Sequence, residues 1–284
     1  MRRWARLRSR ALHARTDGQA AATSTAHRPL DGLAQAIAFL TIVPVPTAAF
    51  GASASAEVGL SGAAVWFPVV GAAVGALAGG VRLLCGEALG ATVATVLAMI
   101  VLVIVTGALH QDGLADTADG LGVRGAAGSA GARARRLEVM RDSATGVFGA
   151  LALIAWALLL FSTLASFDRD RALRALVVAC ALARWAALAH AAATPPARAD
   201  GLGASLRVGR LALGVATAVS VIAALAICGL VAGAAAIGVS ALVCALSVAF
   251  ARRTLGGRTG DTLGATVAIA EVAVCVVLLG VWQG

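Results

Sequence analysis

The residues best suited to chemistry are three aspartates close together in a chain with only 14 acidic residues: Asp112, Asp116 and Asp119. If their segment is helical, the spacing i, i+4 and i+7 places them on one face. Carboxylates on one face repel each other unless a cation or a basic group lies between them. Hard cations such as Mg²⁺ bind through a few carboxylates plus substrate phosphates. The cluster therefore predicts a Mg²⁺ and phosphate site, and the alternative is an acidic, solvated loop between two membrane helices.

A second candidate segment, with Arg141, Asp142 and Ser143, lies directly before an apolar run. Asp142 or Ser143 is expected to cap a helix there, which leaves the first backbone N–H groups of that helix facing the cytoplasm. A helix N-terminus binds phosphate readily, and Arg141 would add a bidentate clamp. Taken alone, these residues are more simply an ordinary cap with an arginine that flanks the membrane.

A third candidate segment repeats this pattern with Gly257, Arg258, Gly260 and Asp261 at the start of the last apolar run. Glycines before a helix let a phosphate approach the backbone closely, and Arg258 supplies positive charge. The segment lacks the lysine and the spacing of a Walker A loop. A flexible loop with a cap explains this segment alone, but three such segments on one membrane face favour a phosphate site.

Three further ionisable residues lie within or beside apolar runs. His110 titrates near neutral pH, so it is a candidate general base, or else a polar residue at the membrane interface. Arg184 and Glu271 fall inside predicted membrane spans, where ionisable groups are costly and usually paired. We expect Arg184 and Glu271 to pair with each other.

The composition indicates an integral membrane protein. Hydrophobic residues make up 60% of the 284 residues and charged residues only 13%, whereas about a quarter of the residues in a soluble domain are charged. The apolar runs are continuous rather than alternating, which favours membrane helices over a β-barrel. The net charge of +9 is expected to mark cytoplasmic segments of a membrane protein rather than nucleic-acid binding.

We predict an all-α, polytopic bundle in the lipid bilayer, with about seven transmembrane helices that each have roughly the 20 residues needed to cross. Residues 31–47 are too short to cross and end in prolines, so they predict an interfacial or re-entrant helix. A Gly-, Ser- and Ala-rich loop is expected at 51–62. The predicted spans are 63–84, 89–109, 147–166, 172–193, 211–232, 234–250 and 264–282.

The arginines set the predicted orientation. Residues 1–29 are arginine-rich and lack the apolar core of a signal peptide, so they predict a cytoplasmic N-terminal extension before one membrane-embedded domain, 30–284. With the N-terminus inside, the cytoplasmic segments carry most of the arginines, as the positive-inside rule requires. This orientation puts all three candidate segments, including an active-site loop at 110–146, on the cytoplasmic face of a bacterial inner membrane.

The motifs resemble those of one enzyme family. HQDGLADTADG at 110–120, RLEVMRDSATGVFGA at 136–150 and LGGRTGDTLGA at 255–265 are similar to motifs of the cobalamin synthase, or adenosylcobinamide-GDP ribazoletransferase, family. FLTIVPVP at 39–46 adds to this likeness, and the resemblance covers roughly residues 30–284. The chain departs from the family pattern at Gln111, where an acidic residue is often found.

The resemblance implies a membrane-bound, Mg²⁺-dependent enzyme that joins α-ribazole or its 5′-phosphate to adenosylcobinamide-GDP. The products would be adenosylcobalamin or its 5′-phosphate, and GMP. On this basis Asp112, Asp116 and Asp119 are expected to hold Mg²⁺, with the first two and His110 acting in catalysis. The expected phosphate-binding set is Arg141, Asp142, Ser143, Gly257, Arg258, Gly260 and Asp261.

Two other classes of protein stay open on the sequence. A CDP-alcohol phosphotransferase also uses aspartates at a cytoplasmic membrane face, but its pattern requires Ala-Arg where Ala115 and Asp116 stand. A cation-coupled transporter would place aspartates in broken helices near the bilayer midplane, commonly between internal repeats. No twofold repeat is visible in this sequence. A homo-oligomer is compatible with the sequence.

Overall fold

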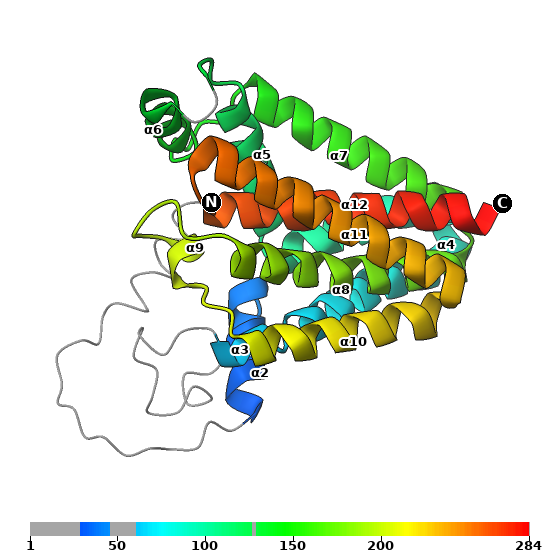
Figure 1. Ribbon diagram of the computed structural model, residues 1–284. Coiled ribbons are helices and arrows are strands. Elements are labelled where there is room, and N and C mark those ends of the chain that lie inside the picture. Colours follow the sequence, from blue (N-terminus) through cyan, green and yellow to red (C-terminus); the bar gives the residue numbers. More distant parts are fainter. Residues whose placement is uncertain (1–28, 46–60, 127–128, 284) are drawn as a thin grey trace.

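The structure, a computed structural model, describes residues 29–45, 61–126 and 129–283. These residues form helices, with no β-pairing among them beyond one isolated bridge between Pro196 and Arg258. Six of the helices are long and apolar enough to cross a membrane, which confirms the predicted helical membrane bundle (Figure 1). They are α4 (Phe67–Thr106), α7 (Val147–Ser166), α8 (Arg169–Ala193), α10 (Arg210–Cys228), α11 (Leu230–Phe250) and α12 (Gly260–Gln283).

Helix α4 has 40 residues and is broken at Gly90, whose backbone angles (φ 77°, ψ 162°) are not helical. A hydrogen bond of 2.8 Å from Arg82 Nε to Thr95 Oγ1 joins residues that are 13 positions apart. In one straight helix these residues would lie about 20 Å apart along the axis. The chain therefore folds back at Gly90, and the two arms of α4 correspond to the predicted spans 63–84 and 89–109. The seven predicted spans thus match six long helices, one of which is folded in two.

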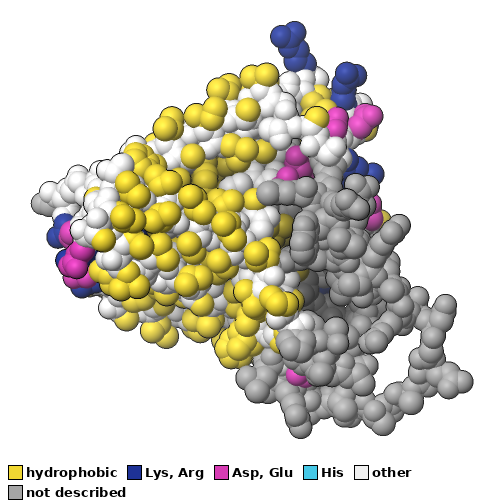
Figure 2. Space-filling view, turned by 180° about the vertical axis from the view of Figure 1, so that it is seen from behind, with side chains coloured by type: hydrophobic (Ala, Val, Ile, Leu, Met, Phe, Trp, Pro, Cys, Tyr) yellow, Lys and Arg dark blue, Asp and Glu magenta, His cyan; other side chains and the backbone are white. Residues whose placement is uncertain are grey.

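Helices α8 and α12 form the centre of the bundle. In their most apolar stretches 72% and 61% of the residues are buried, against 22% to 28% in the other long helices. Glycines of α4 lie directly against α8, and a Cβ on Gly79 would come within 2.9 Å of Leu173 Cα. Small residues allow this close approach and favour packing between membrane helices. Figure 2 shows an apolar surface over the visible face of the bundle, with charged side chains toward the ends of that face.

The predicted pairing of Arg184 with Glu271 is confirmed. Arg184 Nη1 on α8 forms an ion pair with Glu271 Oε1 on α12, and the two side chains are 1% and 5% exposed. The Cys180 thiol lies 3.6 Å from the same carboxylate oxygen. Moving the two helices apart would leave each buried charge without its partner, which costs free energy, so the pair holds the two central helices together.

The predicted loop 110–146 is largely helical, which corrects the prediction. The left-handed residues Gly107 (φ 61°) and Ala108 (φ 54°) end α4 and turn the chain into α5 (Leu109–Leu121). Helix α6 (Ala130–Val139) follows. One side of α5 is buried and packs against α7 and α12, so the alternative of an acidic, solvated loop is excluded.

Helix α2 (Pro29–Leu40) crosses the end of the bundle in Figure 1 and packs on α3 (Ser61–Ala64) and on α4. A short helix thus overlaps the predicted segment 31–47, and whether it is interfacial or re-entrant stays a prediction. The predicted extension 1–29 and the predicted loop 51–62 fall almost entirely outside the described residues.

Candidate active site

All of the predicted site residues lie at one end of the bundle, called the site end, where α5 and α6 meet the first turns of α7 and α12 (Figure 1). The short helix α9 (Leu202–Ser205) lies at the same end. The opposite end holds the turn at Gly90, the junction of α7 with α8, and Gly229 between α10 and α11. The fold therefore gathers three candidate segments that are far apart in the sequence.

Glycine contacts hold the acidic helix α5 against the first turn of α12. A Cβ on Gly113 would lie 2.6 Å from the backbone oxygen of Asp261, and a Cβ on Gly264 would lie 3.4 Å from Gly113 Cα. Larger residues at these positions would push the helices apart. Asp112 is exposed and Asp116 is half-buried. The close approach thus keeps the carboxylate-bearing face of α5 near the start of α12.

Asp119, the third predicted metal ligand, caps α7 from the neighbouring helix. Its carboxylate oxygens accept hydrogen bonds from Gly146 N (2.7 Å) and Gly149 N (2.8 Å). The first turn of a helix leaves such N–H groups without an intrahelical partner. The prediction that Asp142 or Ser143 caps this helix is therefore wrong, because the capping carboxylate comes from α5. The geometry gives Asp119 a structural role at the start of α7, and its predicted metal binding stays a prediction.

Arg141 and its two neighbours form the turn between α6 and α7. Arg141 Nη2 lies 2.9 Å from both carboxylate oxygens of Asp200, and the two side chains are 55% and 72% exposed. Asp142 Oδ1 accepts a hydrogen bond from Ala144 N at 3.1 Å, and Ser143 is exposed. An exposed ion pair is worth only about 0–1 kcal/mol. Arg141 can therefore exchange Asp200 for another anion at little cost.

Arg258 braces the segment 194–206, called the strap below. Arg258 N donates to Pro195 O, and Ala197 N donates to Arg258 O, both at 2.8 Å. The Arg258 guanidinium donates to three strap carbonyls, those of Thr194, Gly203 and Leu206. Burial lowers the pKa of this arginine. The geometry favours this bracing role over the predicted phosphate contact, because the donors of Arg258 are directed at the backbone.

The predicted phosphate-binding glycines, Gly257 and Gly260, lie against the strap. A Cβ on Gly257 would clash with the carbonyl oxygen of Pro195. Gly260 is the first residue of α12, and its backbone nitrogen would lie 2.9 Å from a Cβ on Gly203. Both glycines thus let the strap lie close to the start of α12, and their contact with phosphate stays a prediction.

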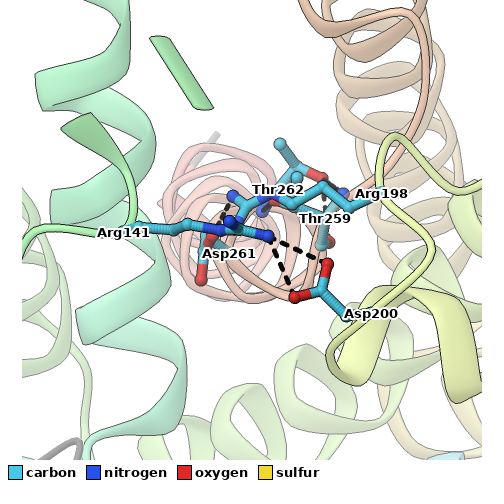
Figure 3. A network of polar contacts seen from close by, with 6 residues as sticks. All are labelled: Arg141, Arg198, Asp200, Thr259, Asp261 and Thr262. Atoms are coloured by element: carbon cyan, nitrogen blue, oxygen red, sulfur yellow. Dashed lines mark hydrogen bonds and ion pairs between the residues drawn. The ribbon is translucent and has the colours of Figure 1, made fainter. Parts of the chain in front are cut away.

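Two ion pairs tie the strap to the rest of the site end, as Figure 3 shows. Arg198 Nη2 reaches Asp261 Oδ2 on α12 at 3.4 Å, and Asp200 makes the pair described above. Beside them, Thr259 N donates to Thr262 Oγ1 at 3.0 Å and Thr262 N donates to Thr259 Oγ1 at 3.1 Å. This reciprocal exchange caps the first turn of α12, as in a capping box.

Sequence reasoning missed Arg198 and Asp200. The strap follows the predicted span 172–193, but it carries no cluster of aspartates, and its charged residues do not directly precede an apolar run. A signal does exist, because two opposite charges, Arg198 and Asp200, lie within four residues after Pro196. Two consecutive prolines restrict the backbone and so fix where the following side chains start.

His110 is buried, with 3% exposure, on the side of α5 that packs against α12. A Cβ on Gly264 would lie 3.5 Å from His110 Cα. Burial lowers the pKa of His110 well below its usual range, and the nearby charge of Arg184 lowers it further. A neutral imidazole can accept a proton. Its burial leaves the ring little contact with solvent, so the predicted role as general base stays a prediction.

The residues that the structure describes contain no group of three His, Cys, Asp or Glu side chains placed to hold a metal ion. Besides Asp119, the carboxylates on α5 are those of Asp112 and Asp116, one helical turn apart. Mg²⁺ in phosphate-transfer sites commonly binds through one or two carboxylates together with substrate phosphates. Two aspartates fit that requirement, provided that the substrate supplies further ligands.

Proteins of known name match nearly the whole chain. The family model for cobalamin-5-phosphate synthase matches residues 32–279. An adenosylcobinamide-GDP ribazoletransferase of Azorhizobium caulinodans is 38% identical over 258 residues, which cover 87% of this chain and 94% of that protein. Proteins with the same name from Roseiflexus sp. and Klebsiella pneumoniae are 37% and 39% identical and cover 86% and 76% of this chain, and 87% and 86% of their own length. No solved structure matches the chain significantly.

Proposed function

The chain belongs to the cobalamin-5-phosphate synthase family and is an enzyme of cobalamin biosynthesis, and we propose that its transfer reaction takes place at the site end. Family membership removes the grounds for a CDP-alcohol phosphotransferase or a transporter. The observation that carries the proposal is the acidic face of α5, held by Gly113 and Gly264 beside the start of α12. Carboxylates, arginines and a helix N-terminus together supply the positioning and charge stabilisation that phosphoryl transfer requires.

The substrates we propose are adenosylcobinamide-GDP and α-ribazole or its 5′-phosphate, after the name that the relatives carry. A ribose hydroxyl of the ribazole attacks the phosphorus that bears the cobinamide arm. Because the 5′ oxygen is esterified in the phosphorylated substrate, another ribose hydroxyl attacks. The bond from this phosphorus to the bridging oxygen of the diphosphate breaks, GMP leaves with the electron pair, and the hydroxyl proton passes to GMP or to solvent. The product is the phosphodiester of adenosylcobalamin or of its 5′-phosphate.

The side chains of the site end would bind and orient these charged groups. Arg141 is exposed and weakly paired, which supports a role in binding a non-bridging phosphate oxygen in exchange for Asp200. The first turn of α12 adds the partial positive charge of a helix N-terminus. Holding both substrates in a fixed geometry converts their encounter into an effectively intramolecular step, which lowers the barrier.

We assign Mg²⁺ binding to Asp112 and Asp116, together with the substrate diphosphate. When bound, the ion would neutralise charge on the diphosphate and on the departing GMP. The exposure of Asp112 and the partial exposure of Asp116 support this assignment, because a ligand can reach both from solution. Asp119 would act indirectly, by fixing α7 against α5.

The arginines support a site that faces the cytoplasm of a bacterial inner membrane. Helix α6 alone carries three arginines at the site end. At the opposite end, Arg169 pairs with Glu87 and Arg171 pairs with Asp168, so that the charges there offset each other. An excess of arginine on one side is typical of the cytoplasmic side of a membrane protein.

The proposal is tested by GMP release from the purified, detergent-solubilised chain supplied with adenosylcobinamide-GDP, α-ribazole and Mg²⁺. Asp112→Asn is compared with Glu87→Gln, which changes an exposed carboxylate at the opposite end. We expect wild type and Glu87→Gln to release GMP and form cobalamin in equal amounts, and EDTA to stop both. Asp112→Asn should lose about 100-fold or more in rate at an unchanged thermal midpoint. A folded wild type that releases no GMP would refute the function, and full activity in Asp112→Asn would refute the site.

A further inference from the structure

The donor capacity of Arg198 is largely unused. Its side chain is 17% exposed, and its one hydrogen bond among the described residues is the 3.4 Å contact with Asp261 Oδ2. The Nε atom is buried and has no hydrogen-bond partner among the described residues. A guanidinium has five N–H donors in a planar fork that matches two oxygens of a carboxylate or a phosphate. One long contact therefore leaves most of this fork without an acceptor.

Arg258, a second arginine at the site end, does use its hydrogen-bond donors. The Arg258 guanidinium donates to three backbone carbonyls, and its Nε contact with Gly203 O is 2.9 Å long. Burying an arginine without such partners costs free energy. The contrast indicates that the donors of Arg198 are kept for a group that is not part of the chain.

The backbone that carries Arg198 is held firmly. The preceding residue, Ala197, donates its N–H to Arg258 O, and Arg258 N donates to Pro195 O in the only bridge among the described residues. The Arg258 side chain braces the strap from within. A fixed backbone with an under-used side chain is the arrangement expected of a residue preorganised for a ligand.

The second arginine beside Arg198 favours an anionic ligand. Figure 3 shows Arg141 and Arg198 reaching toward each other across the end of α12, from the α6–α7 turn and from the strap. Burial lowers the pKa of Arg198, as does the charge of Arg141, whereas the charges of Asp261, Asp200 and Asp116 raise it. Two neighbouring guanidiniums are stabilised by an anion with several oxygens, which can accept from both.

We propose that Arg198 binds a phosphate oxygen of the diphosphate in the nucleotide substrate, and that Asp261 holds its guanidinium in place until the substrate arrives. This inference rests on the proposed function and adds a residue to the same site. Arg198 would supply the fixed half of a two-arginine clamp, whereas the exposed Arg141 would supply the half that moves onto the substrate.

The test compares binding of two corrinoids that differ only in the nucleotide part. The full chain in detergent, without α-ribazole, is titrated with adenosylcobinamide-GDP and separately with adenosylcobinamide. We expect Arg198→Ala to weaken binding of adenosylcobinamide-GDP about 10- to 100-fold, the range for one charged hydrogen-bonding group, and to leave adenosylcobinamide unchanged. Arg207→Ala, at an exposed arginine just after the strap, is the matched control and should change neither affinity.

Two results would overturn the inference: an unchanged affinity of Arg198→Ala for adenosylcobinamide-GDP, or an equal loss for both corrinoids, which would indicate structural damage. Arg198→Lys sharpens the test, because lysine keeps the charge beside Asp261 but loses the fork. Arg198→Lys should recover only part of the lost affinity for adenosylcobinamide-GDP, and full recovery would refute a contact made through the guanidinium fork. Failure of the proposed function would appear separately, as a wild type that binds the nucleotide substrate but releases no GMP when α-ribazole is added.

Discussion

Two arginine–carboxylate pairs in this molecule share their chemistry and differ in their surroundings. Arg184 and Glu271 pair in the centre of the bundle with side chains 1% and 5% exposed, whereas Arg141 and Asp200 pair at the site end with 55% and 72% exposed. A buried pair resists separation because each partner alone would be an uncompensated charge. An exposed pair is screened by water and separates at little cost. The central pair therefore holds the fold, and the site-end pair is available for exchange with a substrate.

The largest effect is expected when the central pair is broken on one side. Glu271→Leu leaves the Arg184 guanidinium buried without a counter-charge, which should lower the free energy of unfolding by about 3–5 kcal/mol. The thermal midpoint of the detergent-solubilised protein measures this loss. Replacing both partners, in Arg184→Met with Glu271→Leu, should restore most of the stability, because an apolar pair of similar volume substitutes well for a buried ion pair. Additive losses in the double variant would show that the two side chains do not interact.

A smaller effect is expected from the cap on α7. Asp119→Ala removes the acceptor for two backbone N–H groups and should cost about 0.5–2 kcal/mol of stability. Ser143→Ala is the control, since Ser143 is exposed and lies three residues before the N-cap residue, Gly146. Its thermal midpoint should match that of wild type. If Ser143→Ala destabilised the protein as much as Asp119→Ala, the assignment of the cap to α5 would be wrong.

The smallest effect on stability is expected at the exposed pair. Asp200→Asn removes the partner of Arg141 at a cost of about 0–1 kcal/mol. The thermal midpoint should therefore stay within the error of the measurement, while the KM for adenosylcobinamide-GDP falls or stays constant because Arg141 is released. A loss of stability as large as that of Glu271→Leu would remove the distinction between the two pairs.

The apolar runs predict the bundle well because membrane spans are set by length and hydropathy within each segment. The run predicted at 147–166 coincides with α7, and the pairing of Arg184 with Glu271 follows from the cost of isolated charges in a membrane. The break between α10 and α11 lies at Gly229, before the predicted boundary at 232–234, because a positive φ of 81° there is not visible in an apolar pattern.

The site is less predictable, because its contacts join residues that are distant in the sequence. The capping of α7 by Asp119 links positions 27 and 30 residues apart, and Arg198 meets Asp261 across 63 residues. Charge and spacing mark Asp112, Asp116 and Asp119 equally. Only the packing of α5 against α7 separates Asp119, which caps a helix, from Asp112 and Asp116.

One paired measurement tests the division of roles between the centre and the site end most directly. GMP release and thermal midpoint are recorded together for Asp112→Asn and for the double variant Arg184→Met with Glu271→Leu. We predict that Asp112→Asn keeps its thermal midpoint and loses GMP release, whereas the double variant keeps both near wild type. GMP release that persists in Asp112→Asn, or that disappears from a double variant of normal stability, would contradict this division.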